Sequence, residues 1–179
     1  MPLYFITGNK NKFEEAKAMI PSLQQLDMDL VEIQSTDAHE IIRAKLNEAL
    51  KYHEGELIVE DTSLYLSCLN GLPGPLIKWF LKSIGNEGIY NLTKSLGDMH
   101  VEVKTCIGYA KNSKNISFYE GSLHGTIVFP NAKTAFGWDP IFQPRGYSKS
   151  FAELGSEEKN KISMRRIAFD KLIADLQKK

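Results

Sequence analysis

Three absences narrow the function of this 179-residue chain before any motif is considered. Basic and acidic residues both number 22, so no net charge draws the chain toward nucleic acid or a membrane surface, and any anion site has to be local. No apolar run approaches the roughly 20 residues that a membrane-spanning helix needs. The first residues also lack the charged-then-apolar pattern of a signal peptide. We therefore expect a soluble, cytoplasmic protein.

Cysteine is scarce, and its positions suggest no metal site. Cys68 and Cys106 lie far apart and match no metal-binding spacing, so we interpret them as buried free thiols in a reducing compartment. The histidines show no paired spacing and receive no role. No internal repeat or low-complexity tract is visible. With 42% apolar residues, the chain can build a proper core, and we expect one domain over residues 1–179, with residues 65–135 as a candidate second lobe.

The hydrophobic pattern predicts an α/β fold with a central mixed sheet flanked by helices. Two strands separated by a helix near the start favour a βαβ arrangement with some parallel pairing. Further along, two long segments joined by a polar turn are typical of antiparallel partners. We expect strands at residues 3–6, 23–33, 56–66, 101–110, 116–127 and around 141–142, and helices at 13–20, 37–53, 77–84, 86–95 and after Ser163.

The first chemical signal is the turn after the first strand. An apolar strand ends in Thr7-Gly8-Asn9-Lys10-Asn11-Lys12, and a helix follows. A helix start leaves backbone N–H groups unpaired and carries partial positive charge, so it favours an anion such as phosphate. The segment is no Walker loop, because it has one glycine and lacks the G-K-[ST] ending. The competing interpretation is an ordinary strand-to-helix turn with an asparagine cap.

The strongest signal is Glu60-Asp61, which we place at the end of the apolar run Leu57-Ile58-Val59. Open α/β sheets bind ligands at the carboxyl ends of their strands. Two adjacent carboxylates repel each other unless a proton or cation intervenes, and Mg²⁺ suits such oxygen ligands. Glu32, at the end of the preceding predicted strand, is a candidate third ligand. The competing interpretations are a solvated strand end for the pair and an ordinary surface acid for Glu32.

The second signal is the loop Phe136-Gly137-Trp138-Asp139-Pro140. Its aromatic rings could stack on a nucleobase, and Asp139 could accept hydrogen bonds from ring N–H groups. The alternative is an aromatic turn that packs in the core.

Basic residues set singly along the chain form the third signal. A solvated surface position is the alternative for each lysine. Arg165 begins the last helix, where a cation is unfavourable, so it needs an anion, a base carbonyl or solvent nearby. The residues concerned are Lys12, Lys45, Lys78, Lys159 and Arg165.

Taken together and in this order, these motifs resemble the inosine triphosphate pyrophosphatases, and most closely the eukaryotic type. Any one motif is weak, but the ordered set spans nearly the whole chain and is highly specific. The segments that carry the resemblance are Thr7-Gly8-Asn9-x-x-Lys12, Val31-Glu32-Ile33-Gln34, Val59-Glu60-Asp61-Thr62, Gly71-Leu72-Pro73-Gly74-Pro75, Ile77-Lys78-Trp79-Phe80, Phe136-Gly137-Trp138-Asp139-Pro140, and Ala152-Glu153 leading to Glu158-Lys159-Asn160.

The resemblance implies an elongated two-lobed fold with the nucleotide in the cleft between the lobes, and a homodimer. It implies Mg²⁺-dependent hydrolysis, with Mn²⁺ as a substitute ion, of ITP, dITP and XTP to the monophosphate and pyrophosphate, a house-cleaning activity. By position, Glu32 and Asp61 would bind the metal, and Asp61 with Glu60 would be catalytic. The substrate would contact Thr7, Gly8, Asn9, Lys10, Lys12, Lys45, Lys78, Phe136, Gly137, Trp138, Asp139, Lys159, Met164 and Arg165.

One departure concerns base recognition. The family typically has Ser-His-Arg at the start of the last helix, whereas this chain has Ser163-Met164-Arg165. The histidine contacts the purine oxo group, and methionine cannot donate that hydrogen bond, which removes about 0.5–1.5 kcal/mol of recognition. Two alternatives therefore stay open: a pyrophosphatase for another modified nucleotide, or a nucleotide-binding protein without catalysis. Retention of Glu32, Glu60 and Asp61 argues against the second.

Overall fold

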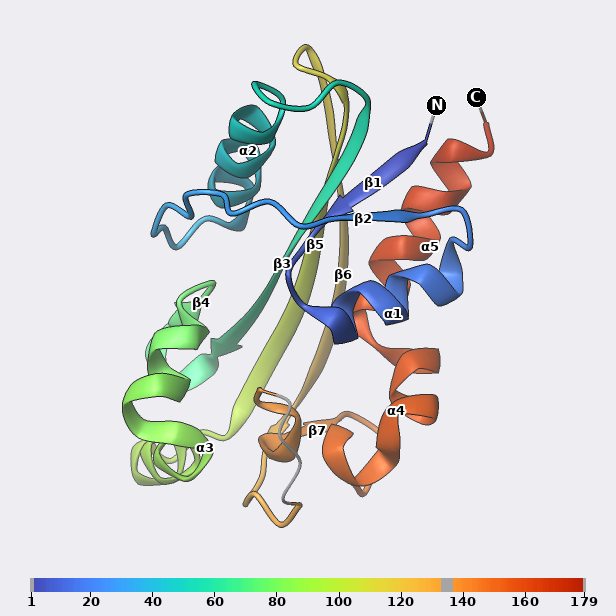
Figure 1. Ribbon diagram of the computed structural model, residues 1–179. Helices are drawn as coiled ribbons and strands as arrows, with labels where there is room; N and C mark the ends of the chain where they lie inside the picture. Colours follow the sequence, from blue (N-terminus) through green and yellow to red (C-terminus); the bar gives the residue numbers. More distant parts are fainter. Residues whose placement is uncertain (1, 133–136, 179) are drawn as a thin grey trace. The chain divides into compact units, whose positions relative to one another are not determined.

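A computed structural model describes residues 2–132 and 137–178 of the chain (Figure 1). The described residues form seven strands, five α-helices and two short 3-10 helices, η1 and η2. Their bounds are β1 Leu3–Ile6, α1 Lys10–Met19, β2 Gln24–Leu26, α2 Ala38–Ala49, β3 Glu56–Leu66, η1 Ser67–Leu69, β4 Pro73–Gly74, α3 Ile77–Leu96, β5 His100–Asn112, β6 Asn115–Ile127, η2 Asp139–Ile141, β7 Phe142–Pro144, α4 Phe151–Ile162 and α5 Met164–Leu176.

The strands form one mixed sheet, as the sequence predicts. Their order is β2-β1-β3-β5-β6-β7, and β4 pairs with β3. β1 runs parallel to both β2 and β3, which confirms the βαβ arrangement, whereas β4 and β7 pair antiparallel with β3 and β6. β5 and β6 are joined by a two-residue hairpin turn. Among the described helices, none is long and apolar enough to cross a membrane.

The chain divides into two compact units. The first contains Met1–Asp61, Thr105–Gly121 and Arg165–Lys179, and the second contains Thr62–Lys104 and Ser122–Met164. β3, β5 and β6 are long enough to contribute residues to both units. Within the part of the chain that the structure describes, the first unit contains two buried clusters of apolar side chains, and the second unit contains one.

In the first unit, helices cover both faces of the strands (Figure 1). Ile58 of β3 packs in a cluster with side chains of α1 and α5, whereas its neighbour Val59 packs in a separate cluster with α2. This division follows from the strand period, because successive side chains point to opposite faces of a sheet. α2 lies very close to β5: a Cβ atom on Gly108 would lie 2.2 Å from Cγ2 of Ile42.

The second unit packs around aromatic rings. Trp138, Phe142 and Phe151 contact one another, with ring centroids 4.8–6.3 Å apart. Met164 belongs to the same buried cluster. α3 contains two helical segments, as expected, because Gly85 has a positive φ of 65° and breaks the helix between them.

Three element predictions need correction. The second strand ends at Leu26 rather than at residue 33, because its partner β1 ends at Ile6 and offers no further backbone to pair with. Glu32 therefore does not end a strand. α2 ends at Ala49, four residues before the expected end. α4 was not predicted, because Gly155, with φ 79° and ψ 166°, interrupts its helical pattern. Its capping box, Ser150 with Glu153, was the available signal.

Candidate active site

The turn between β1 and α1 is organised by its own side chains. Asn9 caps α1, because its Oδ1 accepts a hydrogen bond from the backbone N of Lys12 at 3.1 Å. Thr7 Oγ1 accepts from the backbone N of Asn9, also at 3.1 Å. The helix begins at Lys10, three residues earlier than expected, and the side chain of Lys10 is exposed, as is Gly8. The local structure is thus an asparagine-capped turn, and phosphate binding there stays a prediction.

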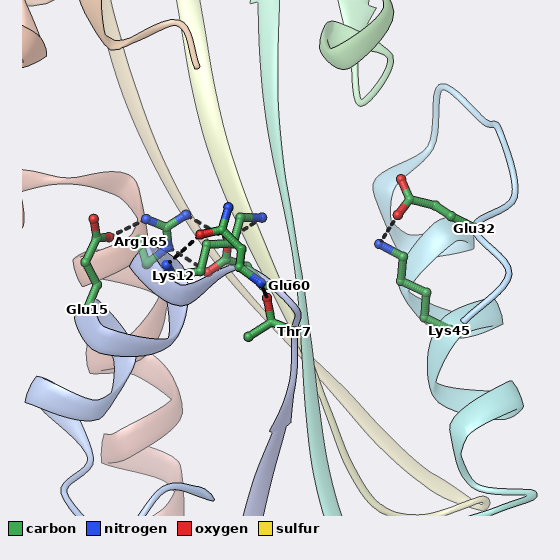
Figure 2. A network of polar contacts seen from close by, with 8 residues as sticks. Thr7, Lys12, Glu15, Glu32, Lys45, Glu60 and Arg165 are labelled. Carbon is green, nitrogen blue, oxygen red and sulfur yellow. Dashed lines mark hydrogen bonds and ion pairs between the residues drawn. The ribbon is translucent and has the colours of Figure 1, made fainter. Parts of the chain in front are cut away.

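Beside this turn lies a cluster of four charged side chains, two buried and two partly exposed. Arg165 of α5 donates to both carboxylate oxygens of Glu60, from Nε at 2.7 Å and from Nη2 at 2.9 Å. Its Nη1 donates to Glu15 of α1, and Lys12 Nζ lies 3.1 Å from Glu60 Oε1 (Figure 2). Arg165 and Glu60 are almost fully buried. This cluster therefore joins α1, β3 and α5. The carboxylates of Glu60 and Glu15 supply the anions that a cation at the start of a helix was expected to need.

The charges in this cluster stabilise one another against the cost of burial. Burial alone would raise the pKa of Glu60, but Arg165 and Lys12 outweigh it and hold that pKa well below its usual range. Burial likewise disfavours the charged form of Arg165, while Glu60 and Glu15 raise its pKa. Glu60 is therefore a carboxylate at every physiological pH, and its position fixes the ammonium group of Lys12 near the start of α1.

Glu60 and Asp61 do not form the adjacent acid pair that the sequence suggested. Both lie in the middle of β3, which continues to Leu66, and not at a strand end. Neighbouring strand residues point to opposite faces, so Glu60 shares the α1/α5 side with Ile58, and Asp61 shares the α2 side with Val59. Ion pairs with Arg165 and Lys12 resolve the charge of Glu60. The two carboxylates thus lie on opposite faces of the strand, in separate surroundings.

On the α2 side lies a second pair of opposite charges. Lys45 Nζ of α2 is 2.7 Å from Oε2 of Glu32, which precedes that helix (Figure 2). Asp61, which is buried, belongs to the same side of the strand as Val59, whose cluster includes Ile42 and Leu46 of α2. Glu32, Lys45 and Asp61 are therefore all assigned to the face of the sheet that α2 covers. Glu32 and Asp61 offer only oxygen atoms as ligands, which fits a hard divalent cation.

The other predicted site residues belong to the second unit. Lys159 Nζ lies 2.6 Å from Asp139 Oδ2, and both side chains are buried. Trp138 packs in the core, as the alternative interpretation of its loop held, and the carbonyl of Gly137 accepts from Asn86 at 3.0 Å. Phe136 lies outside the described residues.

Lys78 and Met164 differ in exposure. Lys78 is exposed, with its Nζ 6.0 Å from the ring centroid of Trp79. Met164 is 2% exposed within the apolar cluster of the second unit, directly before Arg165. A base-reading role for Met164 would therefore have to be carried out by a side chain that is buried in this structure.

Comparison with known proteins agrees with these motifs. The Ham1 family matches residues 3–175, which is nearly the entire chain. The chain belongs to the Ham1 family. The inosine triphosphate pyrophosphatase of Schizosaccharomyces pombe is 37% identical over 174 residues, covering 95% of this chain and 92% of that protein. The proteins of the same name from Pyricularia oryzae and Podospora anserina are 41% and 42% identical, over 95% and 94% of this chain and 90% of each relative.

Solved structures of the Ham1 family share the fold. The Staphylococcus aureus Ham1 protein matches with a TM-score of 0.81 at 27% identity, covering 98% of this chain and 97% of that one. A HAM1 protein from Coxiella burnetii matches with a TM-score of 0.89 at 21% identity, over 99% and 98% of the two chains, and supports the fold alone. The predicted fold class and family are confirmed, and so is the enzyme class, since the relatives' name denotes a hydrolase acting on an acid anhydride.

Proposed function

We propose that this Ham1-family chain is a Mg²⁺-dependent pyrophosphatase for non-canonical purine nucleoside triphosphates such as ITP, dITP and XTP. The observation that supports it most is the family match over residues 3–175, together with three relatives named inosine triphosphate pyrophosphatase. The products are the nucleoside monophosphate and pyrophosphate. The proposal includes a homodimer, as the family resemblance implies.

Residues near the start of α1 bind the phosphates in this proposal. The backbone at Thr7–Lys10 presents the N-terminal end of a helix, and Lys10 adds an exposed ammonium group. Lys12 is held in place by Glu60 at 3.1 Å, so little side-chain entropy is lost when it meets an anion. Glu60 and Arg165 thus act as positioning residues for Lys12, which is a change from the catalytic role expected for Glu60.

Glu32 and Asp61 hold the metal ion. When bound, Mg²⁺ neutralises phosphate charge and polarises the phosphoryl group for attack by water. Lys45 Nζ lies 2.7 Å from Glu32 Oε2, so Lys45 balances the charge of this carboxylate. In this proposal Lys45 contacts substrate phosphate once the metal ion has bound to Glu32. Asp61 orients the attacking water or removes its proton. A carboxylate that is 8% exposed is shielded from bulk solvent, which suits either role.

Base selection is assigned to residues of the second unit. Asp139 is buried and paired with Lys159, so its carboxylate is fixed for accepting hydrogen bonds from a purine ring. Trp138 supports this position from the core, and Gly137, Lys78 and Phe136 complete the proposed contacts. A site whose polar groups match a 6-oxo purine rejects adenine strongly, because the 6-amino group leaves buried groups unpaired.

The direct test is a panel of triphosphates at matched concentrations with Mg²⁺, with pyrophosphate release as the readout. We expect ITP, dITP and XTP to be cleaved well above ATP and GTP, activity to vanish with EDTA, and excess Mg²⁺ or Mn²⁺ to restore it. Cleavage of a different modified nucleotide instead would establish altered base specificity, which Met164 favours. Hydrolysis that persists in EDTA would overturn the roles of Glu32 and Asp61.

Replacing Met164 tests base recognition. Met164→His restores a hydrogen-bond donor worth about 0.5–1.5 kcal/mol, so the ratio of kcat/KM for ITP over ATP should rise about 2- to 12-fold. Met164→Leu is the matched control, because it keeps the volume and the apolar character and should leave the ratio unchanged. Met164 is almost fully buried, so thermal unfolding of both variants must be compared first. An equal ratio in a folded histidine variant would remove this position from base recognition.

A further inference from the structure

Three side chains with different ligand atoms converge on the α2 side of the first unit. His39 of α2, Cys106 of β5 and Glu120 of β6 each offer one ligand atom, and these atoms all lie within 4.8 Å of one another. We propose that they form a binding site for a thiophilic divalent cation, with Zn²⁺ as the ion of best fit. No local spacing in the sequence connects the three residues, which is why we gave Cys106 and the histidines no metal role.

The distances suit zinc after small side-chain shifts. Bond lengths of about 2.0–2.3 Å from zinc to nitrogen, oxygen and one sulfur place tetrahedral ligand atoms about 3.3–3.6 Å apart. His39 Nε2 and Glu120 Oε1 are 2.7 Å apart in their present hydrogen bond, and no pair of ligand atoms exceeds 4.8 Å. Insertion of the ion therefore needs each distance between ligand atoms to change by at most about 1.3 Å, which side-chain rotations provide.

The surroundings hold the ligands and leave an entrance. The His39 ring stacks on Phe118, with centroids 4.3 Å apart and planes 4° from parallel, so its orientation is fixed. Its backbone N donates to Asp37 at 2.8 Å, which anchors the first turn of α2. Cys106 is 3% exposed, whereas the side chains of His39 and Glu120 are 46% and 50% exposed. An ion can therefore enter from solvent and reach the thiol last.

Charge explains how the thiol would become a ligand. Burial, followed by the nearby carboxylates of Glu120, Asp61 and Asp37, raises the pKa of Cys106 to about 12, so without metal the sulfur keeps its proton. On binding, the S–H bond breaks, a sulfur–zinc bond forms, and the proton leaves to solvent. The carboxylates that disfavour a bare thiolate favour a divalent cation at the same place. Three protein ligands leave the fourth zinc position for water.

This site is chemically distinct from the proposed magnesium site. Glu32 and Asp61 offer oxygen alone, which suits a hard ion, whereas a thiol and an imidazole select softer ions. The zinc site does not rest on the proposed function, because its test needs neither nucleotide nor turnover.

The test is a titration of the full-length, metal-free protein with Co²⁺, followed by absorption spectroscopy. Thiolate ligation gives a sulfur-to-cobalt charge-transfer band, and tetrahedral Co²⁺ gives intense visible bands. We expect both at one ion per chain, followed by their loss when Zn²⁺ is added. Cys106→Ser should abolish the charge-transfer band, whereas the matched variant Cys68→Ser, which removes the other cysteine, should keep it.

Two of the proposed ligands are half-exposed, so substitutions of these residues should not disturb folding. His39→Asn and Glu120→Gln alter half-exposed side chains and should each weaken Co²⁺ binding at least 10-fold with unchanged circular dichroism. Glu32→Gln should leave the titration unchanged. Absence of the charge-transfer band in the wild type, its persistence in Cys106→Ser, or its loss in Cys68→Ser would each overturn the proposal.

Discussion

Asp61→Asn is expected to lower the rate of pyrophosphate release by about 10²- to 10⁴-fold, while nucleotide binding persists. This range is the usual contribution of a positioned acid–base group. Asparagine keeps the shape and hydrogen-bonding reach of the side chain, but it has no negative charge to hold a metal ion or remove a proton from water. The measurement pairs pyrophosphate release with ITP binding by calorimetry in Ca²⁺, which occupies oxygen sites.

Asp170→Asn is the matched control for this substitution. Asp170 lies on the surface of α5, where its exposed carboxylate pairs with Arg166, so both activity and stability should stay at wild-type values. Near-normal pyrophosphate release by Asp61→Asn would exclude Asp61 from the mechanism. Loss of ITP binding together with activity would instead assign Asp61 to substrate binding.

Arg165→Met is expected to reduce the free energy of unfolding by about 3–5 kcal/mol, because removing one partner leaves buried charge uncompensated. Arg165 is 1% exposed and makes two hydrogen bonds to the buried carboxylate of Glu60. Urea unfolding followed by circular dichroism measures the change. The adjacent Arg166→Met provides the control, since its surface pair with Asp170 is worth less than about 1 kcal/mol.

The pH dependence of this loss identifies its cause. In the wild type the pKa of Glu60 is lowered, so its ion pairs add stability that is complete above the ordinary glutamate pKa and is lost only as pH falls through the lowered value. Without Arg165, Lys12 remains beside Glu60, but the effect of burial outweighs that of Lys12 and the pKa of Glu60 rises. Protonation then removes the negative charge that Arg165 no longer balances, so the difference in unfolding free energy between variant and wild type should shrink as pH falls from 7 toward about 4.3. The double variant with Glu60→Gln should recover part of the loss; no recovery would contradict a charge-based cause.

Sequence patterns predicted most of the fold, because most elements carry a local signal. The apolar runs of β1 and β3, the Asp37 cap of α2 and the break at Gly85 of α3 are all visible in the chain. The end of β2 was not predictable from its own residues, since it depends on the length of the strand beside it. α4 was missed because its capping box was outweighed by an internal glycine.

The candidate site was predicted as a set of residues but not as an arrangement. Glu60 and Asp61 are neighbours in sequence, and strand geometry sends their side chains to opposite faces. One partner of Glu60 is Arg165, 105 positions away, and no local pattern can indicate such a pair. For the same reason the convergence of His39, Cys106 and Glu120 could be seen only in three dimensions.

Gly108 has a consequence for the chemistry although it contributes no side chain to it. A Cβ atom on Gly108 would overlap Ile42, so the missing side chain at this position allows α2 to pack closely against β5. α2 also carries His39 and Lys45. A larger residue at this position would push α2 away from β5 and move His39 and Lys45 with it, so we expect such a substitution to lower activity although Gly108 contributes no side chain to the proposed sites.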